Sequence, residues 1–332
     1  MSNNLYVISG AAGMTGNELV RQLVARGQFV VGFDNFFAST LDTIKDIINN
    51  NFVFFEYDIN NKKHLDNIFS YVKEKKNKFD NIIYINCAAI VHTEYFYLVN
   101  STFETNVLGM KSFLEQAISI EARQFINCSS SEIYSMCSFR ENGGVQESDY
   151  ALLASAEHSQ RTSYATEKML TEFFAKDAVN NSRIKACSIR FANVYSKNER
   201  FSKHIIPHIL TNLYYKGEVE LLENSKTSYR TFLYNYDSCA AVLSLSNNEE
   251  SLDGSIYNVC TDEEVCIISL VKIIAEKLNI KNPKISFSGR RTADPARRLL
   301  NSQKIRKITG WKPTVSLSEG LDMCIAHMKS SL

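Results

Sequence analysis

A glycine-rich turn between an apolar run and an amphipathic segment is the feature that most constrains the fold of this chain. Residues 5–9, Leu-Tyr-Val-Ile-Ser, predict a buried strand, and residues 17–26 carry apolar side chains at helical spacing. Between them, Gly10-Ala-Ala-Gly13-Met-Thr-Gly16 lets the chain turn sharply and lets the backbone approach a bound group. This order of strand, glycine turn and helix is typical of a loop that binds a dinucleotide pyrophosphate at a helix N-terminus.

An acidic residue closes the next apolar run. Residues 28–33 predict a second strand, and Asp34 follows it, about 20 residues beyond the glycines. A carboxylate there accepts hydrogen bonds from both ribose hydroxyls of adenosine and repels a 2′-phosphate. The pair of features favours NAD over NADP and argues against the alternatives, a plain tight turn and a helix-capping aspartate.

Composition narrows the classes of partner and compartment. The 332 residues carry a formal net charge of +1, which indicates neither a nucleic-acid nor a membrane partner. No run of about 18 apolar residues and no signal peptide occurs, and the eight cysteines include no Cys-x-x-Cys pair. We therefore expect free thiols in a cytoplasmic protein. No metal site is expected, since Pro207 separates His204 from His208 and no acidic residue completes a ligand set.

Strand and helix patterns alternate through the first half of the chain, which predicts an α/β fold with a Rossmann-like, doubly wound parallel sheet. Residues 1–190 are expected to form the dinucleotide-binding domain. Residues 191–332, with shorter mixed elements, are expected to form a smaller mixed α/β C-terminal lobe that covers the substrate, with segments of the two interleaved. Residues 135–160 break the rhythm and are expected to form a loop over a ligand site.

A tyrosine and a lysine with the spacing of one helical turn carry the predicted chemistry. Tyr164-Ala-Thr-Glu-Lys168 places a phenol and an ammonium on one helix face, where the cation is expected to lower the pKa of the tyrosine. Such a tyrosine can take the proton of a sugar hydroxyl as hydride leaves its carbon. Ser130, at the carboxyl end of a predicted strand, is expected to hydrogen-bond the reacting oxygen.

The ordered set of motifs resembles the extended short-chain dehydrogenase/reductase family, in its branch of nucleotide-sugar epimerases, dehydratases and decarboxylases. The resemblance covers nearly the whole chain. Its motifs, in order, are Gly10-x-x-Gly13-x-x-Gly16, Asp34, Asp58-Ile59, Ala88-Ala89, Asn106-Val-x-Gly109, Ser129-Ser-Ser-Glu-Ile-Tyr134, Tyr164-x-x-x-Lys168, Arg190-Phe-Ala-Asn193-Val-Tyr195, Arg230-Thr-Phe-Leu-Tyr-Asn-Tyr-Asp237, Arg290-Arg291-Thr-Ala-Asp294 and Gly310-Trp-Lys-Pro313. Ser135 and Ser196 depart from it, because glycine is usual there, so these turns are expected to differ.

The resemblance implies roles for particular residues. The residues implied in binding NAD are Gly10, Gly13, Met14, Gly16, Asp34, Asn35, Asp58, Ile59, Ala88, Ala89, Asn106, Tyr164 and Lys168. The residues implied in binding a nucleotide-diphosphate sugar are Ser131, Asn193, Arg230 and Arg291, with Arg290 as the alternative to Arg291. Guanidinium groups suit this substrate because they bind diphosphate oxygens bidentately.

The resemblance also implies a homodimer. In the family, two helices pair with their copies, and here these are the predicted helices near 99–120 and 161–181. Both carry apolar residues on more than one face: Val107, Leu108, Phe113 and Leu114, then Tyr164, Met169, Leu170, Phe173 and Phe174.

The choice of reaction depends on Glu132. Family members share oxidation at sugar C4 and differ in the step that follows. Glutamate at this position resembles dehydratases and decarboxylases, and it can act as the base at C5. We favour a 4,6-dehydratase. A 4-epimerase, a uronate decarboxylase and a non-catalytic dinucleotide-binding member remain alternatives, although the intact Ser130, Tyr164 and Lys168 argue against the last.

Overall fold

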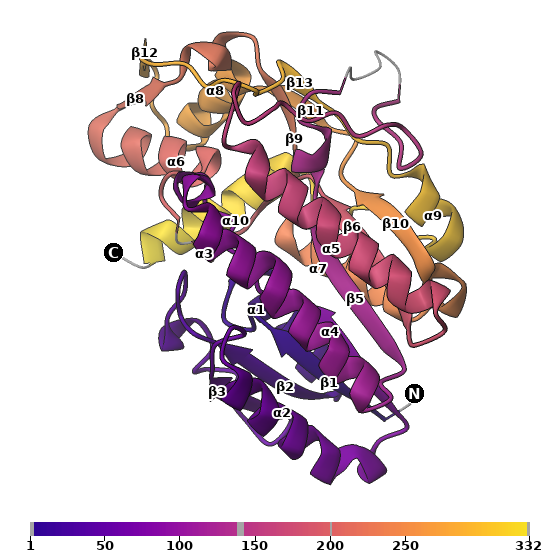
Figure 1. Cartoon of the computed structure of the whole chain (residues 1–332). Coiled ribbons are helices and arrows are strands. Elements are labelled where there is room, and N and C mark those ends of the chain that lie inside the picture. The colour runs from indigo at the N-terminus through magenta and orange to yellow at the C-terminus, as the bar shows by residue number, and fades with distance from the viewer. Residues whose placement is uncertain (1–2, 138–142, 200, 331–332) are drawn as a thin grey trace.

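A seven-stranded parallel sheet forms the centre of the molecule. A computed structural model describes residues 3–137, 143–199 and 201–330 (Figure 1). The strand order is β10-β6-β5-β4-β1-β2-β3, and every neighbouring pair is parallel. The strands are β1 (Asn4–Ser9), β2 (Phe29–Asp34), β3 (Phe52–Glu56), β4 (Asn81–Asn86), β5 (Gln124–Ser130), β6 (Lys185–Phe191) and β10 (Asp253–Val259). This topology confirms the predicted Rossmann-like fold, and the order reverses between β1 and β4, where open sheets bind ligands.

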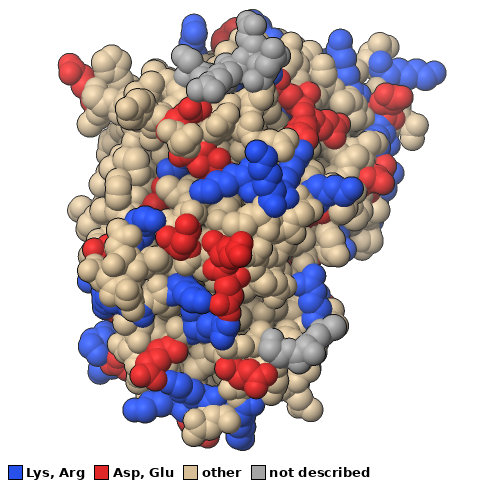
Figure 2. Space-filling model, turned by 90° about the vertical axis from the view of Figure 1, so that its right-hand side faces the viewer, with Lys and Arg blue, Asp and Glu red and all other residues tan. Residues whose placement is uncertain are grey.

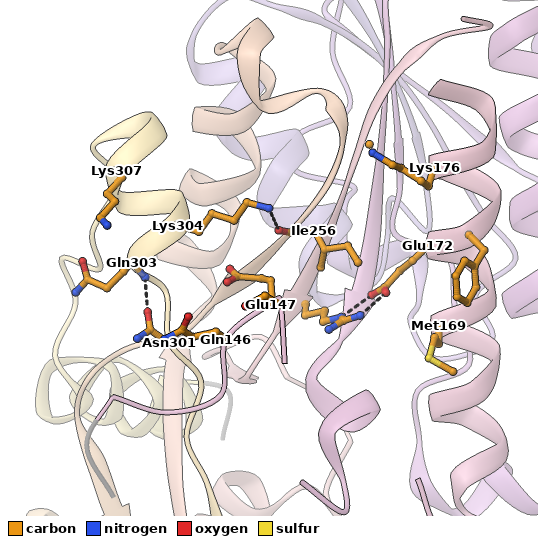
Figure 3. A pocket seen from close by; sticks show the side chains of 14 residues that line it. Gln146, Glu147, Met169, Glu172, Lys176, Ile256, Asn301, Gln303, Lys304 and Lys307 are labelled. Atoms are coloured by element: carbon orange, nitrogen blue, oxygen red, sulfur yellow. Dashed lines mark hydrogen bonds and ion pairs between the residues drawn. The ribbon is translucent and has the colours of Figure 1, made fainter. Parts of the chain in front are cut away.

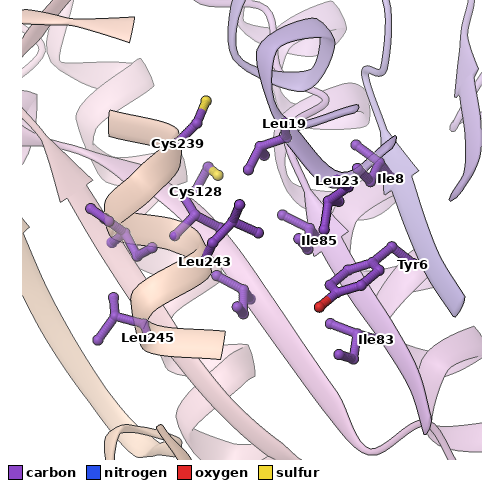
Figure 4. Packing of buried hydrophobic residues seen from close by; sticks show 14 of the residues in the cluster. Tyr6, Ile8, Leu19, Leu23, Ile83, Ile85, Cys128, Cys239, Leu243 and Leu245 are labelled. Atoms are coloured by element: carbon purple, nitrogen blue, oxygen red, sulfur yellow. The ribbon is translucent and has the colours of Figure 1, made fainter. Parts of the chain in front are cut away.

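Helices cover both faces of the sheet because its strands are apolar on both faces. Tyr6 and Ile8 of β1 pack into one hydrophobic cluster, and Leu5 and Val7 pack into another. The first cluster lies against α1 (Met14–Ala25), α7 (Asn235–Ser246) and α9 (Gln303–Thr309), as Figure 4 shows for part of it. The second lies against α2 (Lys62–Lys75), α4 (Met110–Ser119) and α5 (Thr162–Asn180).

The predicted helix near 99–120 is present as one helical run with a π-helical middle. It consists of α3 (Val99–Phe103), a π-helical stretch over Glu104–Gly109, and α4. Gly109 is required here, because a Cβ on it would lie 2.8 Å from the Ile59 side chain. This close approach brings the helix against the chain that follows β3.

The second half of the chain has its own hydrophobic cluster, beyond the carboxyl ends of the large sheet (Figure 1). Its elements are β7 (Asn193–Tyr195), α6 (Ile205–Lys216), β8 (Glu218–Leu221), β9 (Tyr229–Tyr234), β11 (Glu264–Cys266), α8 (Ile267–Lys277), β12 (Lys284–Phe287), β13 (Arg297–Arg298) and α10 (Leu317–Ser330). The same half contributes β10, α7 and α9 to the large sheet and its layers. A division at residue 190 stays a prediction.

Charges of both signs are interspersed over the face shown in Figure 2, in keeping with the net charge of +1. Within the described ranges, no helix is long and apolar enough to cross a membrane.

Candidate active site

The glycine turn places backbone atoms at the carboxyl end of β1. Gly10 has φ +67°, and a Cβ on it would lie 2.8 Å from the Ala88 nitrogen. A Cβ on Gly16 would overlap the Gly10 carbonyl oxygen, so α1 can begin this close to β1 only with glycine there. Gly13 is the N-cap of α1 and makes no side-chain capping bond, which leaves N–H groups of the first helical turn available to an anion.

A cavity of about 310 Å³ opens beside this turn, and residues from four strand ends line it. Asp34 lies in its wall, where its carboxylate accepts hydrogen bonds from the Ala12 nitrogen (3.1 Å) and the Phe36 nitrogen (2.8 Å). Burial raises the pKa of Asp34, and these backbone donors partly offset that rise. Of the residues predicted to bind NAD, those that line the cavity are Gly10, Gly13, Asp34, Asn35, Asp58, Ile59, Ala88 and Ala89.

Asn106, also predicted to bind NAD, is not among the residues that line this cavity. Its side chain is fully buried and binds the backbone of Ile90, accepting from the nitrogen at 2.7 Å and donating to the oxygen at 3.3 Å. It also donates to Glu167 at 2.8 Å. Asn106 therefore fixes the segment after β4 that forms the cavity wall. Met14, also predicted to contact NAD, starts α1, and its carbonyl accepts from Asn235 at 2.7 Å.

The predicted catalytic groups converge beyond β5. Ser130 ends β5, and its hydroxyl accepts from the Glu132 nitrogen at 3.2 Å, which caps the 3₁₀ turn over Ser131–Tyr134. Tyr164 lies near the start of α5, buried and stacked on Phe96 with ring centroids 4.3 Å apart. Lys168 follows one helical turn later and is also buried.

The expected fall in the pKa of Tyr164 is wrong for the protein as described. Burial raises the pKa of this phenol well above its ordinary value, and the nearby Glu132 charge raises it further, while the Ser130 hydroxyl and Arg161 lower it. Burial also lowers the pKa of Lys168. The reason is that the sequence pattern shows the spacing of the two groups but not the dehydration of both.

Glu132 lies in a double ion pair. Its carboxylate is 3.1 Å from the Arg161 guanidinium and also pairs with Arg298, with all three side chains largely buried. Burial alone would raise the pKa of Glu132, but Arg298 and Arg161 outweigh it and hold the pKa at about 2. Arg161 and Arg298 were not predicted as site residues. The available signal was the position of Arg161, one helical turn before Tyr164.

Two further arginines extend this charged cluster. Arg230 donates to Asp294 at 2.9 Å, and Asp294 lies 3.5 Å from Arg298. Arg298 on β13 faces Arg230 on β9 because these strands pair in parallel. Arg291 is half-buried, and its charge is close enough to lower the pKa of Glu132, whereas Arg290 is exposed. The charge cluster thus comprises Glu132, Arg161, Arg230, Arg291, Asp294 and Arg298.

The other two residues predicted to bind substrate lie in the surrounding structure. Ser131 is buried in the 3₁₀ turn, and Asn193 on β7 donates to the Thr231 carbonyl at 3.1 Å. Asn193 thereby fastens β7 to β9. Contact of either residue with substrate stays a prediction.

A second cavity, of about 780 Å³, shares no lining residue with the first (Figure 3). Gln146, Glu147 and Ser148 line it, so this part of the predicted 135–160 loop borders a cavity; residues 138–142 lie outside the described residues. A buried ion pair between Glu172 and Arg190, at 2.6 Å, also lies in its wall.

Comparison with known proteins finds a matching family and similar proteins. Residues 6–260 match the model of a family described as NAD dependent epimerase/dehydratase. UDP-glucuronic acid decarboxylase 4 of Arabidopsis thaliana is 24% identical over 328 residues, which cover 97% of this chain and 68% of that protein.

Solved structures are also similar. The UDP-glucuronic acid 4-epimerase of Bacillus cereus, in complex with UDP-glucuronic acid and NAD, has a TM-score of 0.85 at 20% identity, covering 99% of this chain and 100% of its own. The dTDP-glucose 4,6-dehydratase of Streptomyces venezuelae, with NAD bound, has a TM-score of 0.83 at 20% identity, covering 98% and 97%. At these identities the likeness shows a shared fold.

Proposed function

We propose that this chain, which belongs to the NAD dependent epimerase/dehydratase family, oxidises C4 of a nucleotide-diphosphate uronic acid and then decarboxylates it. NAD is the cofactor of this family, as the glycine turn and Asp34 predicted. The observation that carries the choice of reaction is the pairing of Glu132 with both Arg161 and Arg298.

The oxidation step uses the groups gathered beyond β5. NAD, which the glycine turn and Asp34 would hold, would supply the hydride acceptor for C4 and the hydride donor for the reduction that closes the cycle. Tyr164, as a phenolate, takes the proton of the C4 hydroxyl and becomes a neutral phenol. The Ser130 hydroxyl favours the phenolate before this transfer, as its lowering effect on the raised pKa of Tyr164 indicates. Lys168 supplies a positive charge one turn along α5.

Decarboxylation fits a glutamate that is held as an anion. A uronate oxidised at C4 is a β-keto acid, so the electron pair of the C5–C6 bond can move toward the ketone as carbon dioxide leaves. This step needs no base at C5. The enolate that forms then takes a proton from solvent at C5, which restores the C4 ketone. The guanidiniums of Arg161 and Arg298 suit a substrate carboxylate, and their Nε atoms are buried without a hydrogen-bond partner among the described residues.

The 4,6-dehydratase favoured from the sequence remains the second candidate. It is supported by the position of Glu132, two residues beyond Ser130 on the same turn. A carboxylate whose pKa is about 2 is a weak base at neutral pH, however, and removal of the C5 proton requires a stronger one. For this reason we rank decarboxylation ahead of dehydration.

A panel of nucleotide sugars tests the proposal. Purified protein is incubated with UDP-, GDP-, dTDP- and CDP-linked hexoses and uronic acids, and products are identified by mass. Loss of carbon dioxide from a uronate is the expected result. Loss of water would establish the dehydratase instead, an isomer of unchanged mass would establish the epimerase, and no product from any substrate would leave the non-catalytic reading.

Two matched arginine variants test the substrate carboxylate. Arg161→Met should weaken kcat/KM for the uronate by the equivalent of about 2–5 kcal/mol, the usual cost of truncating one partner of a buried charge pair. Arg290→Met is the control, because Arg290 is exposed and lies outside the charge cluster. Equal effects of the two variants would contradict a carboxylate site at Arg161.

We also propose a homodimer formed through α3, α4 and α5. The support is that apolar side chains are exposed along them: Phe103 on α3 by 39%, Leu108 on the π-helical stretch between α3 and α4 by 46%, and Phe173 on α5 by 63%. Val107, Phe113, Leu114 and Tyr164, also expected on this surface, are buried in the chain itself. Light scattering should give twice the mass of one chain, and Phe173→Asp should shift that mass toward the monomer.

A further inference from the structure

Two cysteine side chains meet where β4 and β5 end at the cavity beside the glycine turn. The Sγ atoms of Cys87 and Cys128 are 3.7 Å apart. Asn86 and Asn127 are register partners, so these cysteines follow one step later on adjacent parallel chains. Cys128 lies in the apolar layer between the sheet and α7, near Cys239 (Figure 4), and Cys87 lines that cavity.

We propose that Cys87 and Cys128 form a peroxide-sensitive dithiol, a modification site in the cavity wall that closes to a disulfide and thereby weakens cofactor binding. Hydrogen peroxide is the oxidant that the proposal names. The inference stands independently of which sugar reaction the enzyme performs.

The backbone geometry allows the bond. Neighbouring strands lie about 4.8 Å apart, and a disulfide spans Cα atoms about 4.4–6.8 Å apart. The sulfurs need to approach from 3.7 Å to about 2 Å, which takes side-chain rotation together with a small shift of Cys87 toward Cys128. Cys87 is half-buried and faces the cavity, so a water-sized oxidant has an entrance to the pair.

The surroundings favour one sulfur as the thiolate. A hydrogen bond from Cys87 lowers the pKa of Cys128 and the Lys168 charge lowers it further, against the effect of burial. The same hydrogen bond and burial raise the pKa of Cys87. Of the two sulfurs, Cys128 is therefore the more readily deprotonated, and Cys87 is the less readily deprotonated neighbour.

The chemistry balances with one peroxide. The Cys128 thiolate attacks a peroxide oxygen, the O–O bond breaks, and the departing hydroxide takes the proton of Cys87 as water. The Cys87 thiolate then attacks the Cys128 sulfenic acid, and its hydroxyl leaves as the second water once protonated. Two thiols lose two electrons in total, and hydrogen peroxide gains them.

Formation of the disulfide affects the cavity through hydrogen bonds and a close backbone contact next to Cys87. The Ser9 hydroxyl accepts hydrogen bonds from the nitrogens of Cys87 (3.2 Å) and Ala88 (3.3 Å). Gly10 packs directly on the Ala88 backbone, with no room even for a Cβ. A shift of Cys87 toward Cys128 therefore displaces the wall that faces the glycine turn, and we expect NAD affinity to fall by roughly 5- to 150-fold, the usual range of coupling between sites.

The experiment measures this coupling from both directions. Full-length protein is treated with hydrogen peroxide, digested under non-reducing conditions and analysed by mass for a Cys87–Cys128 link that dithiothreitol reverses. NAD affinity is measured for the oxidised and reduced forms, and the midpoint potential of the pair is titrated with and without NAD. Because coupling is reciprocal, NAD should make the potential more positive, by about 30 mV for each tenfold difference in affinity.

Cysteine variants distinguish the two sulfurs. In Cys87→Ser, peroxide should leave a Cys128 sulfenic acid that dimedone labels; in Cys128→Ser, Cys87 should stay unlabelled. Cys266→Ser is the control and should retain the link, because Cys266 lies on β11, in the four-stranded sheet that β11 forms with β7, β9 and β13. Absence of the Cys87–Cys128 link in peroxide-treated wild-type protein, or equal NAD affinity of its oxidised and reduced forms, would overturn the proposal without bearing on the sugar reaction.

Discussion

The cavity beside the glycine turn and the charge cluster are built in different ways. The cavity is lined by short stretches that each follow a strand, and backbone atoms make much of its wall, as at Gly10 and Ala88. The charge cluster is built from long side chains that lie on segments far apart in the chain, from Glu132 to Arg298. A site formed by backbone atoms requires particular residues at a fixed spacing in the sequence. A site formed by long side chains requires only that residues of the right type come together in the folded protein.

The largest expected effect belongs to Tyr164, whose pKa responds to Glu132 and Arg161 of the charge cluster. Tyr164→Phe keeps the ring that stacks on Phe96 but removes the proton acceptor, and loss of such a group typically costs about 10²–10⁴ in rate. No NADH should accumulate on addition of substrate, as measured by absorbance in single-turnover experiments. NADH formation at nearly the wild-type rate would assign the proton to another group.

Breaking the charge cluster should cost stability as well as activity. Arg298→Met leaves Glu132 with Arg161 as its remaining ion-pair partner in the described structure, and removal of one partner of a buried pair costs about 3–5 kcal/mol of unfolding free energy. Denaturant titration measures this loss. The matched control is Arg297→Met on the same strand, whose partly exposed pair with Glu264 should be worth about 0–1 kcal/mol.

The decrease in the free energy of unfolding at acid pH should also depend on the charge cluster. The pKa of Glu132 is about 2 in the folded protein against its ordinary value of 4.5, so its ion pairs stabilise the fold above pH 4.5. That contribution falls as the pH drops from 4.5 through about 2, and at about 1.4 kcal/mol per pKa unit it amounts to roughly 3 kcal/mol. Glu132→Gln should therefore show a shallower loss of stability in this window. An unchanged decrease in stability at acid pH would contradict the depressed pKa.

Particular residues show what the sequence could and could not reveal. The sheet, the glycine turn and Asp34 were predictable because backbone geometry restricts each of those positions. Arg298 was missed because nothing in its own neighbourhood in the sequence distinguishes a buried, paired arginine from an exposed one such as Arg290. For Arg161 the only signal was its position one helical turn before Tyr164. The predicted fall in the pKa of Tyr164 was wrong because burial raises this pKa, and burial is a property of the tertiary structure that the helical spacing to Lys168 does not reveal.

The glycine turn offers the converse test, in which one methyl group should matter. Gly16→Ala places a Cβ on the Gly10 carbonyl, and such overpacking costs about 1–3 kcal/mol. Gly13→Ala is the matched control, since its Cβ would lie 3.3 Å from the same oxygen and a small shift relieves it. Thermal unfolding should separate the two variants. Equal losses would mean that the backbone at α1 adapts more than the close packing suggests.

The smallest expected effect is on cofactor choice. Asp34→Asn keeps the size of the side chain and one acceptor oxygen, but its amide group faces the Ala12 or Phe36 nitrogen, each of which donates to the carboxylate. Loss of one such hydrogen bond, or of one to the ribose, costs about 0.5–1.5 kcal/mol, so NAD should bind up to about tenfold more weakly. Removal of the negative charge should at the same time improve NADP relative to NAD. Calorimetric titration with both dinucleotides measures the ratio, with Asp42→Asn as the control, because Asp42 pairs with Lys45 and is not among the residues that line the cavity. If Asp34→Asn weakens the binding of both dinucleotides equally, the role of Asp34 is to hold the glycine loop at Ala12 and the turn after β2 at Phe36, rather than to select the ribose.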